Sequence, residues 1–378
     1  MTASGAAAPR ERASLGELAR VFLKLGTVSF GGPAAHIAMM EDEVVRRRAW
    51  LGRDEFLDLI GAVNLIPGPN STEMAIHVGR AQAGWRGLLV AGGCFILPAV
   101  LIVGWVAWAY VRFGALPATA GLLYGVKPVV IAVVLQALWG LGRTAVRSWW
   151  LAALAAAAVA ATALGANELL VLAVAAALGV AWKTGRGPAL GLAAAGSFAA
   201  APASWGLGAL FGVFLKVGAV LFGSGYVLLA FLRADLVLRL HWLTEHQLLD
   251  SVAVGQVTPG PVFTTATFVG YVLHGVSGAA VATLGIFLPA FVYVALSAAI
   301  LPRLRRSPAA RAALDAVNVA SLALMAVVTW QLAGAALVDA WTVALAAGSA
   351  LLLLRYRVNS SWLVLGGAAV GMAVRALG

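Results

Sequence analysis

The chain carries one sequence pattern twice. Residues 22–26 read Phe-Leu-Lys-Leu-Gly and open a stretch that ends in Pro67-Gly68-Pro69, whereas residues 214–218 read Phe-Leu-Lys-Val-Gly and open one that ends in Pro259-Gly260-Pro261. The two copies are in register, because 214 − 22 and 259 − 67 both give 192. A duplication of this kind in an apolar chain predicts two half-molecules with a site between them.

The duplication covers nearly the whole chain. Thr72 matches Thr264 at the same offset, one residue is then missing from the second copy, and Trp150 matches Trp341 at an offset of 191 (341 − 150). We therefore expect two domains, residues 1–190 and residues 205–378.

Composition places the chain in a membrane. It is 62% apolar and 11% charged, with a mean hydropathy of +0.94, whereas soluble domains are roughly 45–50% apolar and about 25% charged. Apolar runs that could cross a bilayer, some of them short, lie over residues 87–111, 129–141, 149–164, 169–182, 279–301, 317–332 and 341–354.

The charged residues and the cysteine exclude several classes of protein. The net charge of +11 is spread over short loops between apolar runs, which indicates topology signals rather than a nucleic-acid surface. A lone cysteine, Cys94, excludes an internal disulfide and a Cys-rich metal or redox centre. We expect no catalytic residue, metal or cofactor, and no phosphate-loop motif is present to bind a nucleotide. The N-terminal segment lacks a signal peptide, which fits a multi-pass protein of the bacterial inner membrane.

Each half is predicted to contain a helical hairpin that enters the membrane without crossing it. The expected order is an interrupted apolar helix, a short helix, the Pro-Gly-Pro break and a second short helix, followed by four more helices. These first three helices are expected over residues 18–40, 54–66 and 70–81 and over residues 207–232, 245–257 and 262–273. Irregular backbone at membrane depth is tolerated only where it is buried in protein or lines a cavity, so the breaks should lie at a functional centre.

The loop charges indicate that the halves have opposite orientation. In the first half, arginines precede and follow the two spans over residues 87–111 and 129–141, and the loop between these spans holds a single arginine. In the second half, the two outer loops hold no lysine or arginine, and the loop between the spans holds four arginines. The residues involved are Arg80, Arg86, Arg143 and Arg147 against Arg112, and Arg303, Arg305, Arg306 and Arg311 in the second half. The expected fold is an all-α integral membrane protein of two inverted repeats, each with about five transmembrane helices and one re-entrant Pro-Gly-Pro hairpin.

The Pro-Gly-Pro tips are the main candidates for a binding site. Glycine permits close approach of backbone to a ligand, and the helices that begin at Asn70 and Val262 offer free N–H groups and a positive dipole end to an anion. The alternative is that Pro-Gly-Pro only shapes the fold. Because both tips must be buried, we favour the site, with Gly68 and Gly260 at its centre.

Two lysines lie within apolar helices. A lysine in this setting is costly and indicates function, although Lys24 could equally extend its amine to the membrane surface near Arg20. Lys216 is farther from other charges, which favours a functional role. Both are expected to add positive potential for an anion.

Polar side chains and glycines crowd the predicted tips and could hydrogen-bond an oxyanion or satisfy broken backbone groups. The full set of candidate substrate-binding residues is Lys24, Gly31, Gly32, Asn64, Gly68, Ser71, Thr72, Lys216, Gly223, Gly225, Gln256, Thr258, Gly260, Thr264 and Thr265.

Three carboxylates could couple transport to protons. Glu73 is the preferred candidate and has Thr265 at its equivalent position. For Asp58 and Asp250 we favour pairing with Arg47 and Arg239, or compensation of a helix dipole, over proton coupling.

The motifs of both halves resemble the chromate ion transporter (CHR) family, in its long, two-repeat form. In the first half these are Phe30-Gly31-Gly32-Pro33, Trp50-Leu51, Pro67-Gly68-Pro69 and Phe95-Ile96-Leu97-Pro98. In the second half they are Phe222-Gly223-Ser224-Gly225-Tyr226, Trp242-Leu243-Thr244, residues 255–261 and Ile286-Phe287-Leu288-Pro289. Asn64, where the family often carries glutamine, and Ser224, within a usual glycine run, depart from the pattern.

The resemblance implies a secondary transporter that exports chromate, driven by the proton-motive force, and confers chromate resistance; related members handle sulfate. The expected partners are chromate or a related oxyanion, protons and membrane lipid, with a homodimer also allowed and no nucleic acid. The residues alone reach only a transporter of a small anion. Two alternatives stay open: an intramembrane enzyme acting on a lipid phosphate, and a passive anion channel.

Overall fold

The computed structural model describes residues 12–30, 32–114, 117–185, 206–222, 225–356 and 358–377, and these residues form helices and turns without a strand. The first half comprises α1 (Leu15–Val28), α2 (Pro33–Glu41), η1 (Asp42–Arg47), α3 (Arg53–Val63), α4 (Asn70–Phe113), α5 (Pro117–Ala145), α6 (Trp149–Ala163) and α7 (Glu168–Thr184). The second half comprises α8 (Leu207–Val220), η3 (Gly225–Val227), α9 (Leu228–Leu232), η4 (Arg233–Arg239), α10 (Glu245–Val257), η5 (Val262–Thr264), α11 (Thr265–Arg306), α12 (Pro308–Ala336), α13 (Ala340–Tyr356) and α14 (Ser360–Leu377).

The two halves repeat each other even in their irregularities. Both contain a π-helical turn, η1 and η4, in the polar stretch after the interrupted first helix. Both then place a non-glycine residue at positive φ, Ala49 at 51° and His241 at 52°. Features that cost conformational energy would not recur by chance, so the repeated sequence specifies the backbone in detail.

The helix after each Pro-Gly-Pro break bends sharply. In α4 the kink lies at Ala83 and Gly84, and in α11 the kink lies at His274 and Gly275. In the first half the bend brings Gly79 so close to the Gly87 backbone that a Cβ atom at either position would collide with the other. The short helix expected over residues 70–81 is therefore the first arm of α4, and the apolar run over residues 87–111 is its second arm.

The opening helix of each half is fixed to this second arm. Phe22 of α1 is fully buried. Gly26 lies against the Phe95 carbonyl and Gly218 against the Ile286 carbonyl, with no room for a side chain at either glycine. The first helix ends at equivalent residues in the two copies, Val28 in α1 and Val220 in α8.

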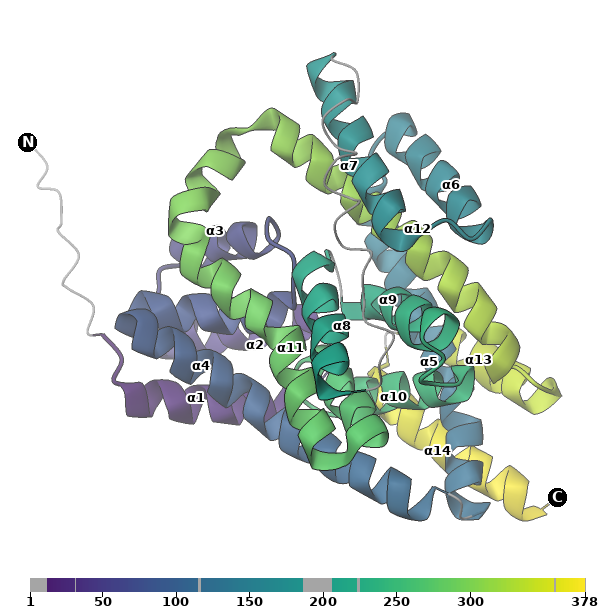
Figure 1. Cartoon of the computed structure of the whole chain (residues 1–378). Helices are drawn as coiled ribbons and strands as arrows, with labels where there is room; N and C mark the ends of the chain where they lie inside the picture. Colours follow the sequence, from purple (N-terminus) through teal and green to yellow (C-terminus); the bar gives the residue numbers. More distant parts are fainter. Residues whose placement is uncertain are drawn as a thin grey trace, which may run out of the picture.

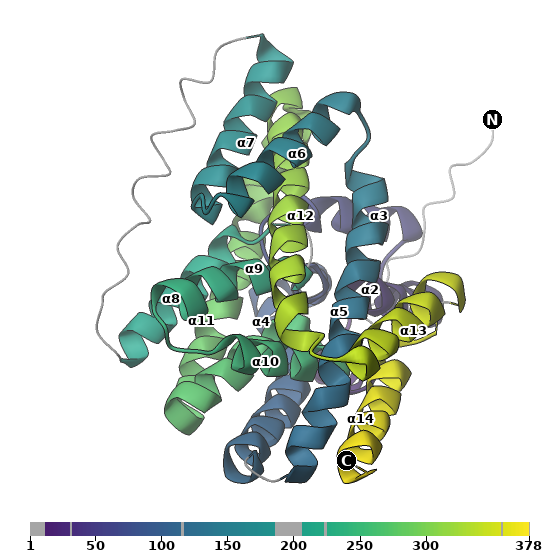
Figure 2. The ribbon, with the colours of Figure 1, turned by 90° about the vertical axis from the view of Figure 1, so that its right-hand side faces the viewer.

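The halves exchange their last helices. Helices α6 and α7 of the first half pack against α12 of the second, whereas α13 and α14 of the second half pack against α5 of the first. Figures 1 and 2 show α6 and α7 at one end of the molecule and α13 and α14 at the other, with α5 and α12 side by side between them. This exchange makes the two copies one folded body.

The apolar helices fit an integral membrane protein. Among the described residues, four segments are long and apolar enough to cross a bilayer, residues 70–113, 121–145, 262–297 and 308–336. Helices α6, α8, α13 and α14 are also apolar but shorter.

Candidate functional site

The two Pro-Gly-Pro tips are held by hydrogen bonds that cross between the halves. The Gly68 amide donates to the Leu221 carbonyl at 2.8 Å, and the Gly260 amide donates to the Ser29 carbonyl at 2.9 Å. Leu221 and Ser29 are the C-terminal caps of α8 and α1. Each tip is therefore fixed by the opening helix of the other half.

Both tip positions require glycine. Gly68 has a φ of +139° and Gly260 has a φ of +90°, which side chains of L-residues rarely adopt. A Cβ at Gly68 would collide with Glu73 Oε1, and one at Gly260 would lie 2.7 Å from the Ala99 Cβ. The predicted importance of these glycines thus has a steric basis, whatever they bind.

A small pocket lies between the tips and is lined by matching residues of both halves. Its volume is about 10 Å³, near the minimum that holds one water molecule. The lining residues are Pro33, Pro69, Asn70, Ser71, Gly225, Pro261, Val262 and Phe263. Helices α2 and α4 begin there from one half, and the helical segments that begin at Gly225 and Val262 meet them from the other.

Some of the predicted binding residues lie at this pocket. Ser71 and Gly225 line it, and Gly32 caps the N-terminus of α2 at a φ of +82°. The predicted residues Gly31 and Gly223 fall outside the described residues.

The tip threonines of the second half satisfy backbone carbonyls. The hydroxyls of Thr258, Thr264 and Thr265 donate to the carbonyls of Val254, Pro261 and Val262 at 2.9, 2.8 and 2.8 Å. For these three hydroxyls, the structure shows the satisfaction of backbone groups that was considered above as the alternative to oxyanion binding. In the described part of the chain, by contrast, Thr72 Oγ1 and Gln256 Nε2 are buried without a hydrogen-bond partner.

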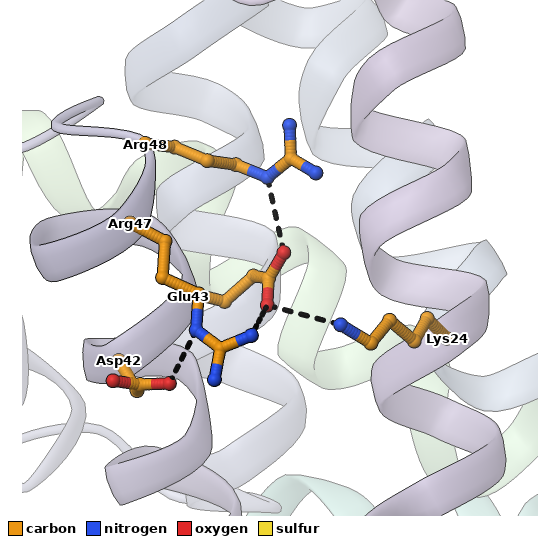
Figure 3. Close-up of polar contacts among 5 residues, drawn as sticks. All are labelled: Lys24, Asp42, Glu43, Arg47 and Arg48. Carbon is orange, nitrogen blue, oxygen red and sulfur yellow. Dashed lines mark hydrogen bonds and ion pairs between the residues drawn. The ribbon is translucent and has the colours of Figure 1, made fainter.

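Lys24 lies in a charged cluster beside η1, not at the small pocket (Figure 3). Its Nζ is 3.2 Å from Glu43 Oε2, and the same carboxylate contacts Arg48 at 3.1 Å and Arg47 at 3.9 Å. Arg47 also contacts Asp42 at 2.7 Å. Burial opposes ionisation of Glu43, but the hydrogen bonds from Lys24 and Arg48 outweigh it and lower the pKa of this carboxyl.

Lys216 occupies the equivalent cluster in the second half. It forms an ion pair with Asp235 of η4, whose other oxygen lies 2.8 Å from Arg239. The side chains of Lys216 and Asp235 are 17% and 5% exposed, against 54% for Lys24. The second cluster is therefore the more deeply buried of the two.

The carboxylate of Glu73 is fully buried against the Gly68 tip. Neither of its oxygens has a hydrogen-bond partner among the described residues. The equivalent Thr265 is uncharged, so this acidic group exists in one half only.

Asp250 does not pair with Arg239 as the sequence led us to expect. Its Oδ1 lies 3.1 Å from Lys127 Nζ and its Oδ2 accepts a hydrogen bond from Tyr110 at 2.9 Å. The preferred pairing of Asp250 with Arg239 is therefore wrong, because the η4 arginine is held by Asp235 on its own helical turn. Asp58, the equivalent residue on α3, is exposed rather than buried.

Two larger cavities lie at opposite ends of the antiparallel pair α5 and α12. The first, about 470 Å³, is lined by the C-terminal end of α5, the N-terminal half of α12 and the predicted residue Asn64, which accepts a hydrogen bond from Asn70 at 3.1 Å. The second, about 640 Å³, is lined by the N-terminal half of α5, the C-terminal end of α12, and residues of α10 that include Asp250. Asn70 lines both the first cavity and the small pocket.

Lys127 and Tyr110 are not among the residues predicted from the sequence. Lys127 is an isolated charge between residues 121 and 141, within the apolar segment of α5, so the criterion that selected Lys216 could have selected it. No sequence signal identifies Tyr110, because its role depends on α4 lying beside α10.

Comparison with known proteins agrees with the resemblance in the motifs. The family model described as "Chromate transporter" matches twice, at residues 16–180 and 208–372. A chromate transport protein of Cupriavidus metallidurans is 32% identical over 98% of this chain and 95% of its own length. A probable chromate transport protein of Synechococcus elongatus is 32% identical over 83% of both chains, and a chromate transport protein of Pseudomonas aeruginosa is 33% identical over 72% of this chain and 70% of its own. No solved structure matches the chain. With both repeats matched by one family model, the chain belongs to the chromate transporter family.

Proposed function

We propose that this protein binds chromate between its two Pro-Gly-Pro tips and exports it from the bacterial cytoplasm, driven by the proton-motive force. Export by this route would confer resistance to chromate. Sulfate, a dianion of the same tetrahedral shape, is the natural competing substrate.

The observation that carries the proposal is the small pocket lined by equivalent residues of the two halves. The N-termini of α2 and α4 begin there at Pro33 and Asn70, and their dipoles favour an anion. The amides of Gly68 and Gly260 are already bound to carbonyls, so the free N–H groups of the helix starts, with Ser71, would hold the oxyanion.

The topology belongs to the same proposal. Two inverted repeats, each with a re-entrant hairpin, would bring both tips to the centre of the membrane. The reciprocal bonds of Gly68 and Gly260 and the exchange of the last helices support this arrangement. We place the protein in the inner membrane, where lipid would cover its exposed apolar helices.

Alternating access would connect the site to each side in turn. The pocket between the tips is about 10 Å³, whereas the cavities at the two ends of α5 and α12 are about 470 and 640 Å³. Rocking of one half against the other would widen the connection from the tips to one cavity and narrow it to the other. A passive channel would need no such alternation.

Glu73 is the first candidate for proton coupling. It lies beside the Gly68 tip without a counter-charge among the described residues, so entry of a dianion would favour its protonated form. Asp250 and Asp58 are the further candidates, of which Asp250 is buried and Asp58 is exposed.

Lys24 and Lys216 enter the proposal through their charge. They face Glu43 and Asp235 rather than the pocket, so they would act on the anion at a distance, or directly after leaving these partners. The family is one of transporters, so the protein is a transporter and not an enzyme.

Chromate uptake into everted membrane vesicles tests the proposal. Vesicles with the wild-type protein should accumulate chromate when respiration energises them, and a protonophore should abolish the accumulation. Gly260→Ala and Lys216→Ala should each lower it at equal expression. Gly93→Ala is the matched control, because a Cβ at Gly93 meets nothing within 4 Å. Equilibration without accumulation would indicate a channel, and full activity of both variants would contradict the assigned site.

A further inference from the structure

The second cavity contains more positive than negative charge. It is bounded by α4, α5, α10, α11, α12 and α14, and its volume is about 640 Å³. The ionisable side chains that line it are Tyr110, Tyr124, Lys127, His246, Asp250 and Arg375. Asp250 is the single carboxylate in this lining, against two permanent cations.

Lys127 and Asp250 form an ion pair at the wall of this cavity. Nζ and Oδ1 are 3.1 Å apart, and the two side chains are 15% and 4% exposed. Tyr110 holds the other oxygen of Asp250 at 2.9 Å. Since α10 belongs to the second half and α4 and α5 to the first, the pair lies where the halves meet.

The fold does not require this ion pair. The residue equivalent to Lys127 is Asn318 (127 + 191), which lines the first cavity, and the residue equivalent to Asp250 is the exposed Asp58. At the equivalent places of the other half, Asn318 on α12 carries no charge and Asp58 on α3 is exposed, so no ion pair of this kind recurs there. A buried ion pair seldom adds stability over a neutral pair, so its presence beside one cavity alone indicates a role in function.

We propose that Lys127 is a binding residue for the transported oxyanion in the second cavity, and that it exchanges Asp250 for the anion. The lysine keeps its proton and its charge throughout. As the dianion takes the ammonium group, the Asp250 carboxylate takes up one proton that water in the cavity relays from the bulk solution, and it becomes a carboxylic acid, while Tyr110 still donates to its other oxygen. Each oxyanion that enters therefore brings one proton to this site.

The surroundings of Asp250 limit which groups can respond to pH. Tyr110 faces it from α4, Lys127 from α5 and His246 from its own helix. On α14, Arg375 lies 5.0 Å above the Tyr124 ring. His246 is exposed, so His246→Gln separates its titration from that of Asp250.

The proposal rests on the proposed function, and binding of radiolabelled chromate to the purified protein in lipid nanodiscs tests it. Lys127→Gln with Asp250→Asn removes both charges and leaves neither unpaired. This double variant should bind chromate about tenfold more weakly or worse, as expected when a charged hydrogen-bond partner is lost, with an unchanged Tm. Asp250→Asn alone frees the lysine and should bind at least as tightly as wild type, without the strengthening of binding that the wild type and His246→Gln show as pH falls.

A control variant and the possible outcomes distinguish failure of this inference from failure of the proposed function. Lys183→Gln removes an exposed lysine at the end of α7 and should bind like wild type. If wild type transports chromate and the double variant binds it equally well, Lys127 is not a binding residue and only this inference fails. If wild type moves another oxyanion but not chromate, the same comparison applies with that anion. If it moves neither, the proposed function fails and this inference with it.

Discussion

The two Pro-Gly-Pro tips share their backbone and differ in their charge. Gly68 and Gly260 both have positive φ and both donate to the end of the opposite first helix. Beside Gly68, however, lies the buried carboxylate of Glu73, whereas the equivalent position in the second half is Thr265. Lys127 and Asn318 likewise occupy equivalent positions in the two halves, and only the lysine is charged. Symmetry thus accounts for the fold and the shape of the pocket, and the asymmetric charges are where we expect proton coupling to arise.

The largest difference in stability between the halves should come from the two helix lysines. Lys216→Ala removes one of the two cations that contact the nearly buried Asp235, and should lower the free energy of unfolding by about 1.5–3 kcal/mol. Lys24 is half exposed, and Glu43 keeps two arginines, so Lys24→Ala should cost only about 0–1 kcal/mol. Denaturation of the purified variants measures both. Equal losses would show that the two clusters are energetically alike.

Alanine at the tip glycines should have the next largest effect, and it should be similar in both halves. Gly68→Ala and Gly260→Ala force a side chain into a disfavoured backbone conformation and a close contact, and each should cost about 1–3 kcal/mol. Gly93→Ala, in open space on α4, should instead stabilise by up to about 1 kcal/mol. Thermal unfolding in detergent is the measurement. Unchanged stability of either tip variant would show that its glycine is not in the close contact described above.

Glu73→Gln should change coupling with little change in stability. The glutamine has nearly the same shape but cannot ionise, so chromate transport in vesicles should continue while its response to a pH gradient weakens. Thr265→Val, at the equivalent position, should keep the full response. If Glu73→Gln transports chromate with an unchanged dependence on the gradient, the proton enters elsewhere, and Asp250 becomes the next residue to test.

The smallest effect is expected from the surface contact between Tyr124 and Asp339. Tyr124 donates a 2.6 Å hydrogen bond to Asp339, which lowers the pKa of this carboxyl below its ordinary value. A lowered pKa in the folded state stabilises the protein above the ordinary pKa, and the stabilisation is lost as pH falls through the lowered value. Tyr124→Phe should therefore be slightly less stable than wild type at neutral pH and equal to it in acid. A difference that grows in acid would contradict this assignment.

The sequence repeat made the backbone of the site predictable, but it did not predict which charged side chains would pair. Matching Pro67-Gly68-Pro69 to Pro259-Gly260-Pro261 predicted two breaks at one functional centre, and the pocket between the tips is lined by both copies. Pairing of side chains depends on which helices become neighbours. The exchange of the last helices and the packing of α10 against α5 bring Asp250 to Lys127, which is 123 residues away (250 − 127).

The error at Arg239 has a local cause. Its true partner, Asp235, is four residues earlier on the same helical turn, and such neighbours meet on one face of a helix. The prediction from the sequence pairs the arginine with Asp250, on the following helix, instead. The π-helical geometry of η1 and η4 could not be deduced from the sequence either, because no composition rule distinguishes it from an α-helix.

The most direct test of the account is uptake of chromate by proteoliposomes that contain only this protein. With an imposed pH gradient, we expect chromate to accumulate above its external concentration, sulfate to compete, and accumulation to stop when the gradient is collapsed. Chromate flux no greater than in protein-free liposomes, with or without the gradient, would contradict the claim that the two tips form one site for a transported oxyanion.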